Sequence, residues 1–306
     1  MTGAPTPGAT PRVIGIGELV WDLLPGGQRL GGAPFNVVAH LARFGWLADY
    51  VTAVGHDALG RRAIDQVGRL GVDTSLIQTS DRPTGVVRVR LDAAGVPDYE
   101  IVTPAAYEAI GRLDADALEV ASRAGVLVFG TLAQRFAGMR KATQQIVEAA
   151  GEGVRLYDVN LRRGCWDPAL LRELLGLATI VKLNDEEQAT LATVLGLPDS
   201  PIEAFARALA SRYSLRGVCV TRGPAGAGLL LDDVYRASAA PRIDVVDTVG
   251  AGDAFAAGLA RGVVDGRPVP EILDLAIRLG ALVASRPGAI PAWSLAELGR
   301  FDPPTV

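Results

Sequence analysis

The residues 247–253, DTVGAGD, combine two glycines with two aspartates at the start of an apolar segment. Glycines let a backbone approach a ligand closely, and the following AFAAGLARGV predicts a helix whose N-terminus attracts anions. We therefore expect the backbone of Gly250, Ala251 and Gly252 to bind an anionic group. Asp253, in the first turn, could accept a proton from a hydroxyl that attacks a phosphoryl group. The alternative is that Asp253 only complements the helix dipole.

A second glycine pair lies near the N-terminus. Gly31 and Gly32 precede Pro34, a residue typical of a first helical turn, so a small ligand could approach the backbone there. Asn36 would follow in that first turn, and its amide can both donate to and accept from hydroxyl groups. Asp22 follows a predicted strand and could accept from hydroxyls as well. A glycine turn with an ordinary helix-start Asn is the alternative interpretation.

These residues must be positioned by an alternation of strands and helices, which predicts a parallel sheet covered on both faces. One period-two stretch without a helix, at 85–92 and 98–102, predicts an antiparallel hairpin outside that sheet. The expected strands are 13–18, 50–54, 126–129, 154–159, 179–183, 217–221 and the hairpin 226–231 with 235–239; the expected helices are 34–44, 57–70, 114–123, 135–150, 168–175, 185–195, 202–213, 251–264 and 270–285.

Polar residues cluster where several of these strands end. Ligands of open parallel sheets bind beyond the carboxyl ends of the strands, so these clusters should meet at one edge. Asp158, Asn160 and Arg162 alternate, which predicts that all three lie on one side of the strand end. Asn184 and Glu187 are spaced as a variant of the helix capping box.

Composition excludes several other classes. With 306 residues, a net charge of −4 and a pI near 5.4, the chain offers no basic surface for nucleic acid. It shows no apolar run near the ~18 residues that span a membrane and no leader pattern, so we expect a cytoplasmic protein. Two Cys and two His predict neither a disulfide framework nor a zinc site.

Two nucleotide-binding motifs are also absent. Lysine occurs only at 141 and 182 and never follows glycine, which excludes the Walker-A loop. The third glycine of a dinucleotide fingerprint that begins at Gly15 would fall on Val20, which disfavours an oxidoreductase.

The heptapeptide matches the DTxGAGD signature of the PfkB, or ribokinase-like, carbohydrate kinases, and GGAPFNV at 31–37 resembles their N-terminal element. The resemblance covers roughly 13–291, and GELVWDLLP, DVNLR and VKLNDEE look most like fructokinases. It implies an α/β fold, a three-layer αβα sandwich with a mostly parallel central sheet. It further implies a single ribokinase-like domain over 1–306, with a small β lid formed by about 18–31 and 84–103.

The resemblance also assigns roles to residues. It implies that Asp253 is the catalytic base, with the anion hole formed by Gly250, Ala251 and Gly252. The expected sugar contacts are Asp22, Gly31, Gly32, Asn36 and Arg162. The expected nucleotide contacts are Asn184, Thr221, Gly223, Gly226 and Gly252. The expected metal-site residues are Glu187, which would hold Mg²⁺ through water, and Asp247 with Thr248, which would hold a K⁺ ion whose presence stays open.

The family therefore predicts ATP and Mg²⁺ as cofactors, a small sugar as substrate, and a homodimer formed through the lid. Fructose, giving fructose 6-phosphate, is the first hypothesis. A 2-keto-3-deoxygluconate kinase, a ribokinase, a nucleoside kinase and a non-catalytic sugar- or nucleotide-binding relative are the alternatives. The chain has Ile277–Gly280 as IRLG where many relatives carry an Asn, so the adenine contacts are left open.

Overall fold

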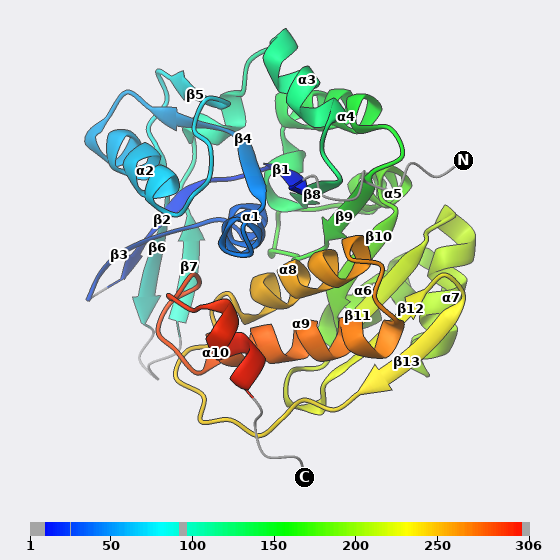
Figure 1. Ribbon diagram of the computed structural model, residues 1–306. Coiled ribbons are helices and arrows are strands. Elements are labelled where there is room, and N and C mark those ends of the chain that lie inside the picture. Colours follow the sequence, from blue (N-terminus) through cyan, green and yellow to red (C-terminus); the bar gives the residue numbers. More distant parts are fainter. Residues whose placement is uncertain (1–9, 25, 92–96, 302–306) are drawn as a thin grey trace.

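The computed structural model describes residues 10–24, 26–91 and 97–301. Two sheets carry the architecture, and helices cover both faces of the larger one (Figure 1). Its nine strands have the order β13-β12-β11-β10-β9-β8-β1-β4-β5. These strands are β1 Arg12–Ile16, β4 Leu47–Gly55, β5 Ile77–Ser80, β8 Val126–Gly130, β9 Val154–Asp158, β10 Ile180–Asn184, β11 Gly217–Thr221, β12 Ala227–Leu231 and β13 Val234–Ser238.

Neighbouring strands from β5 to β11 run parallel, so their carboxyl ends meet at one edge. β12 and β13 add an antiparallel hairpin beyond β11. The predicted mostly parallel sheet is thus confirmed. The chain moves from one side of β1 to the other between β5 and β8, so β1 lies between β4 and β8.

Each face of the sheet has its own apolar core. On one face lie α1 Ala33–Arg43, α2 Ala58–Arg69, α8 Ala251–Val264 and α9 Val269–Ala284, with α10 Leu295–Arg300 against α9. On the other face lie α3 Ala115–Ser122, α4 Ala137–Ala150, α5 Pro168–Leu177, α6 Asp185–Leu195 and α7 Ile202–Tyr213. Three short 3₁₀ turns, η1 Ala106–Ala109, η2 Leu132–Arg135 and η3 Gly223–Ala225, complete the elements.

Helix ends follow the local chemistry of the sequence. Asp57 caps α2 by accepting a hydrogen bond from the Gly60 amide, and Gly71 follows that helix with a φ of 82°. Gly45, with a φ of 85°, follows α1 in the same way. These residues explain why the predicted helices 34–44 and 57–70 were found nearly as expected.

The smaller sheet has four strands in the order β3-β2-β6-β7: β2 Val20–Leu24, β3 Gly27–Gly31, β6 Gly85–Leu91 and β7 Pro97–Ile101. The predicted hairpin is present as β6 and β7, although its turn at 92–96 lies outside the described residues. The sheet falls within the segments expected to form a lid. Its behaviour as a lid remains a prediction.

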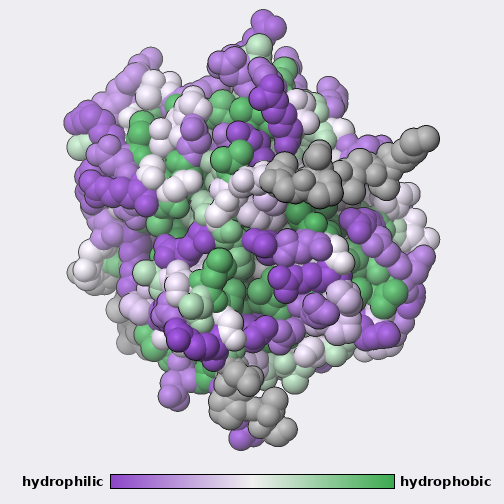
Figure 2. All heavy atoms as spheres, viewed as in Figure 1, coloured by the Kyte–Doolittle hydropathy of each residue, from purple (hydrophilic) through white to green (hydrophobic). Residues whose placement is uncertain are grey.

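Several elements differ from the local sequence pattern. The strands β2 and β3 lie within the segment 18–31, which the family resemblance had placed in the β lid but for which no strand bounds were predicted. The strand β5 and the helix α10, which closes the described chain, were not expected. On the face in Figure 2, hydrophilic residues are spread widely, with smaller hydrophobic areas between them. Among the described residues, no helix has both the length and the apolarity needed to cross a membrane.

Candidate active site

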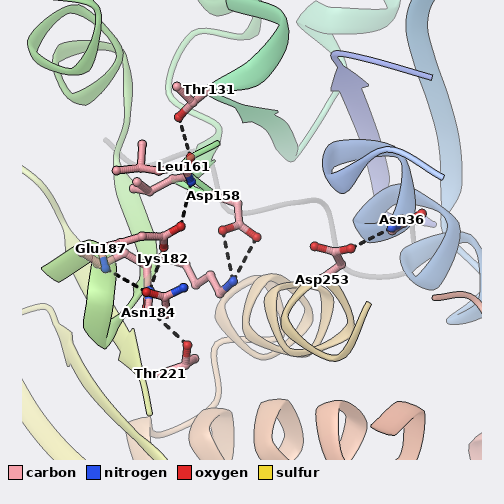
Figure 3. A network of polar contacts seen from close by, with 11 residues as sticks. Asn36, Thr131, Asp158, Leu161, Lys182, Asn184, Glu187, Thr221 and Asp253 are labelled. Carbon is pink, nitrogen blue, oxygen red and sulfur yellow. Dashed lines mark hydrogen bonds and ion pairs between the residues drawn. The ribbon is translucent and has the colours of Figure 1, made fainter. Parts of the chain in front are cut away.

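The predicted base Asp253 faces a partner from the other end of the chain. The amide Nδ2 of Asn36, in the first turn of α1, donates to Oδ2 of Asp253, in the first turn of α8, at 2.7 Å (Figure 3). Burial raises the pKa of Asp253 above its ordinary value, while the bond from Asn36 and the charges of Lys182 and Arg162 act against that rise. The two glycine-rich motifs of the sequence therefore converge on one carboxylate.

The N-terminus of α8 has the geometry expected of an anion site. No described side chain caps this helix, although the Ala251 amide donates to the backbone carbonyl of Thr248 at 3.3 Å. Gly250 stands at the N-cap with a φ of 80°, and a Cβ there would lie 2.4 Å from the Cα of Ala289. Only glycine fits both the conformation and the space.

Lys182, which the sequence reading gave no role, lies in this site. Its Nζ donates to both carboxylate oxygens of Asp158, at 3.1 and 3.2 Å, and both side chains are buried (Figure 3). A Cβ on Gly252 would come within 3.1 Å of the same Nζ, so the ammonium group lies beside the first turn of α8. The signal was available, because Lys182 is one of two lysines and lies one residue before the end of the predicted strand 179–183.

The charges around this ammonium group keep it protonated. Burial lowers the pKa of Lys182, but Asp158, Asp253 and Glu187 together outweigh burial and raise it. Burial raises the pKa of Asp158 to about 6 despite the neighbouring lysine. The Lys182 ammonium group is therefore a buried cation near three carboxylates and beside the predicted anion site.

Glu18, the last residue of the predicted strand 13–18, has no role assigned from the sequence. Its Oε1 accepts from the Ala33 amide at 3.3 Å, whereas its Oε2 is buried with no hydrogen-bond partner among the described residues. Burial raises the pKa of Glu18 to about 7. A Cβ at Gly32 would meet the backbone oxygen of Glu18 at 2.2 Å, which explains the glycine with a φ of 141°.

The expected sugar contacts form one group around Gly31. A Cβ there would lie 3.7 Å from Oδ1 of Asn36 and 3.8 Å from Oδ2 of Asp22. Oδ1 of Asn36 is buried without a hydrogen-bond partner among the described residues. Burial raises the pKa of Asp22, and the positive charges of Arg162 and Arg29 oppose this rise. Open acceptor oxygens and a small residue are what a hydroxylated ligand would need.

The predicted alternation of Asp158, Asn160 and Arg162 is wrong past the first residue. β9 ends at Asp158, and Asn160 has a φ of 38°, so the chain turns instead of continuing as a strand. Arg162 is exposed in the following loop. Its charge still opposes the rise in the pKa of both Glu18 and Asp253, which places it near these two carboxylates.

Asn184 and Glu187 form a complete capping box at the start of α6. The Asn184 side chain accepts from the Glu187 amide at 2.8 Å, and Oε2 of Glu187 accepts from the Asn184 amide at 2.9 Å. Oε1 of Glu187 accepts from the Leu161 amide at 2.8 Å. A carboxylate has further lone pairs, so these contacts fit a Mg²⁺ ion held through water rather than directly.

The expected nucleotide residues lie on the two neighbouring strands β10 and β11. Asn184 and Thr221 are register partners there, and Oγ1 of Thr221 donates to the Leu183 carbonyl at 3.4 Å. Gly223 and Gly226 follow with φ values of 50° and 88°. A Cβ at Gly226 would lie 1.9 Å from the Ser238 carbonyl oxygen, so this glycine is needed for the turn itself.

Asp247 and Thr248 begin the loop that leads into α8. Oδ1 of Asp247 accepts from the Val249 amide at 3.0 Å, and Oδ2 accepts from the Gly288 amide at 2.9 Å and from Nη1 of Arg29 at 2.8 Å. Potassium is coordinated by oxygen atoms. Here the carboxylate is already bound by three N–H donors, one of them cationic, so the residues present do not fit an additional K⁺ ion.

Together these groups can carry out a group transfer between two ligands. One side, near Gly31 and Asp22, offers acceptors for hydroxyl groups; the other, along Asn184 and Thr221, offers glycine turns and a capped helix. Asp253 and the first turn of α8, which no described side chain caps, lie between them. A hydroxyl bound beside Asp253 could lose its proton there while an anionic group rests on the helix N-terminus.

Comparison with known proteins agrees with the family resemblance found in the sequence. Residues 25–295 match the model of the pfkB family of carbohydrate kinases. The chain is 32% identical to a fructokinase of Klebsiella pneumoniae over 296 residues, which cover 90% of this chain and 94% of that protein.

Two solved structures share the fold. A fructokinase from Xylella fastidiosa with bound ATP superposes with a TM-score of 0.83 at 23% identity, covering 95% of this chain and 97% of the other. A ribokinase from Arabidopsis thaliana, complexed with ribose and ATP, gives 0.80 at 23% identity, covering 96% and 99%. The predicted three-layer fold is thereby confirmed.

Proposed function

Since the chain belongs to the pfkB family of carbohydrate kinases and is an ATP-dependent phosphotransferase, we propose that its acceptor is fructose. The γ-phosphate of ATP would pass to the primary hydroxyl that gives fructose 6-phosphate. The fructokinase of K. pneumoniae, at 32% identity over nearly the whole chain, supports this choice of sugar.

The observation that carries the mechanism is the bond between Asn36 and Asp253 beside the uncapped start of α8. Asn36 orients the carboxylate, and the acceptor hydroxyl lies against its free oxygen. Asp253 takes the proton of that hydroxyl as the new P–O bond forms. The transition state of phosphoryl transfer is loose, so the base acts late and mainly by orienting the nucleophile.

Groups of this chain stabilise the negative charge that develops on the transferred phosphoryl group. The amides of Ala251 and Gly252, with the dipole of α8, stabilise the transferred phosphoryl group. The Lys182 ammonium, held by Asp158 beside Gly252, adds a buried positive charge at the same place. Arg162, which is exposed, adds a positive charge near Glu18 and Asp253.

Glu187 would hold Mg²⁺ through water, and Mg²⁺ supplies charge neutralisation of the nucleotide phosphates when bound. Asn184 fixes Glu187 by the capping box, so one feature serves both the helix and the metal. The adenosine part of ATP would lie along Thr221, Gly223 and Gly226. Asp22, Gly31 and Gly32 would face the sugar.

The alternatives within the family differ in the acceptor. A ribokinase, a 2-keto-3-deoxygluconate kinase and a nucleoside kinase would use the same base and anion hole. A coupled assay of ADP release over a panel of hexoses, pentoses, 2-keto-3-deoxygluconate and nucleosides separates them. Fructose should give the highest kcat/KM by at least ~10-fold, the ratio that about 1.4 kcal/mol of acceptor contacts supplies. A higher value for any other acceptor would reassign the substrate.

We also propose that the four-stranded sheet is a lid over the sugar and an interface between two copies of the chain. β3 and β7 are its edge strands, and exposed strand edges are commonly covered. Sedimentation velocity at micromolar concentration should show a dimer. Hydrogen exchange should slow within 84–91 when sugar and nucleotide bind together, and unchanged exchange would rule out closure.

A further inference from the structure

Arg29 connects the smaller sheet to the loop that begins the predicted anion site. The arginine lies on β3, where it is the register partner of Asp22 in β2. Its Nη1 donates to Oδ2 of Asp247 at 2.8 Å, and the two residues are 218 positions apart in the sequence. The same guanidinium group lies over Gly288, where a Cβ would meet Nη1 at 3.8 Å.

Asp247 in turn joins the two backbone segments that shape the start of α8. Its oxygens accept from the Val249 amide on one segment and from the Gly288 amide on the other. The next residue, Ala289, packs against Gly250 so closely that a Cβ on Gly250 would lie 2.4 Å from its Cα. The position of this carboxylate therefore determines the shape of the N-cap of α8.

A carboxylate in this place needs a positive partner. It lies just before a helix N-terminus that is proposed to receive phosphate, and an unpaired negative charge there would repel that anion. Burial acts to raise the pKa of Asp247, but the amides of Gly288 and Val249 and the charge of Arg29 outweigh burial, and the pKa falls below its ordinary value. Asp247 is thus ionised, and it forms an ion pair with the guanidinium group of Arg29 at 2.8 Å.

On the basis of the proposed kinase function, we propose that Arg29 is a built-in counterion that takes the place of a monovalent cation at Asp247. The enzyme then needs no K⁺ ion to shape its anion site. Instead, the anion site depends on the position of β3. Because Asp22 is paired with Arg29 across β2 and β3, a sugar that fixes Asp22 also fixes the counterion of Asp247.

The test compares the wild type with Arg29→Met, which keeps the aliphatic stem and removes the charge. Rates are measured at one ionic strength in the chlorides of K⁺, Na⁺ and tetramethylammonium. We expect the wild type to have similar rates in all three salts. Arg29→Met should lose ~10-fold or more in kcat/KM in tetramethylammonium, since a hydrogen bond to a charged group is lost. K⁺ should restore much of that loss by entering the vacated place.

Two further variants make the result specific. Arg29→Lys keeps a charge and should stay independent of K⁺. Arg62→Met is the matched control, because Arg62 bonds Gln28 on the same strand at 2.8 Å and lies over Trp21, away from Asp247. It should leave the rates and their independence of the salt unchanged.

Thermal unfolding gives a readout that does not depend on turnover. K⁺ should raise the melting temperature of Arg29→Met by ~2 °C relative to tetramethylammonium and leave that of the wild type unchanged. Severalfold stimulation of the wild type by K⁺, or an Arg29→Met enzyme that behaves as the wild type in every salt, would overturn the proposal. If no sugar is phosphorylated, the proposed acceptor fails, but the unfolding experiment still decides the counterion.

Discussion

Asn36 and Asp253 are hydrogen-bonded at 2.7 Å although 217 positions separate them in the chain. Each stands in the first turn of a helix, α1 and α8, and these helices pack against each other on one face of the large sheet. The bond places a neutral amide donor on the carboxylate that is proposed as the base. It also leaves Oδ1 of Asn36 buried and open to a ligand.

Replacing Asp253 by Asn should keep the fold and the affinity for ATP while kcat falls ~10²–10⁴-fold, because loss of a general base has that typical effect. Sugar binding should change much less, since the amide keeps the shape of the carboxylate. Steady-state kinetics and nucleotide titration measure both. Asp265→Asn, at the other end of α8, is the control. A variant within about threefold of wild type would remove Asp253 from the base role.

Replacing Asn36 by Ala should move the acid limb of the pH profile. Asp253 must be ionised to accept a proton, so activity is lost as the pH falls through its pKa. The bond from Asn36 lowers that pKa against the effect of burial, and its removal should shift the acid limb of kcat/KM to higher pH. If KM for the sugar rises while the acid limb stays in place, Asn36 contacts only the sugar.

Lys182→Met should weaken ATP binding and turnover by ~10-fold or more, the value of a hydrogen bond to a charged group. The variant also leaves Asp158 buried without its partner, which destabilises the fold. The double variant Asp158→Asn/Lys182→Met removes both charges and should recover the stability but not the turnover. Lys141→Met, which alters the other lysine, is the control. Recovery of turnover in the double variant would show that the pair is only structural.

Glu187→Gln should raise the Mg²⁺ concentration for half-maximal rate by ~10-fold or more, as loss of a group that orients the metal's waters typically does. The neighbouring Glu186→Gln, on the exposed side of α6, should leave it unchanged. Magnesium titrations at saturating ATP measure the difference. An unchanged titration in a folded Glu187→Gln enzyme would leave Glu187 with its capping role alone.

His40 should make the protein sensitive to acid. Its ring is buried between the Ala289 carbonyl, 3.0 Å from Nε2, and the Trp293 indole, which donates to Nδ1 at 3.0 Å. Burial lowers the pKa of His40 to about 4, so the folded state holds the neutral ring. The contribution of the neutral ring to the free energy of unfolding is complete above the unfolded pKa near 6.5. It is lost as the pH falls toward 4 and amounts in total to about 3 kcal/mol.

Urea unfolding of His40→Gln at pH 5 and pH 7.5 checks this expectation. Gln can still donate to Ala289 and accept from Trp293, but it does not titrate. The variant should lose less stability than the wild type between these pH values. His56→Gln, which alters the exposed second histidine, should match the wild type. An equal loss in all three proteins would assign the acid sensitivity to carboxylates such as Glu18 and Asp158.

Local sequence signals were sufficient for most of the fold. Asp57 and Gly71 mark the ends of α2. The alternation of strands and helices predicts a parallel sheet, because the spacing of apolar residues indicates which side of each element is buried. The bounds and pairing of β2 and β3 were not predicted, although the resemblance placed a β lid there. The strand β2 pairs with β6, more than sixty residues later, so its partner cannot be seen from within the segment.

The sequence by itself determined the site's motifs: the glycines that only a tight backbone approach explains, the aspartate at the start of α8, and the capping box of Asn184 and Glu187. Tertiary structure alone decided which of these groups act on one another. Asn36 meets Asp253, Lys182 meets Asp158 and Arg29 meets Asp247 because α1, β10 and β3 are brought to one edge of the sheet by packing. Such contacts depend on burial and on distant partners, and the pKa of Glu18 changes for the same reason.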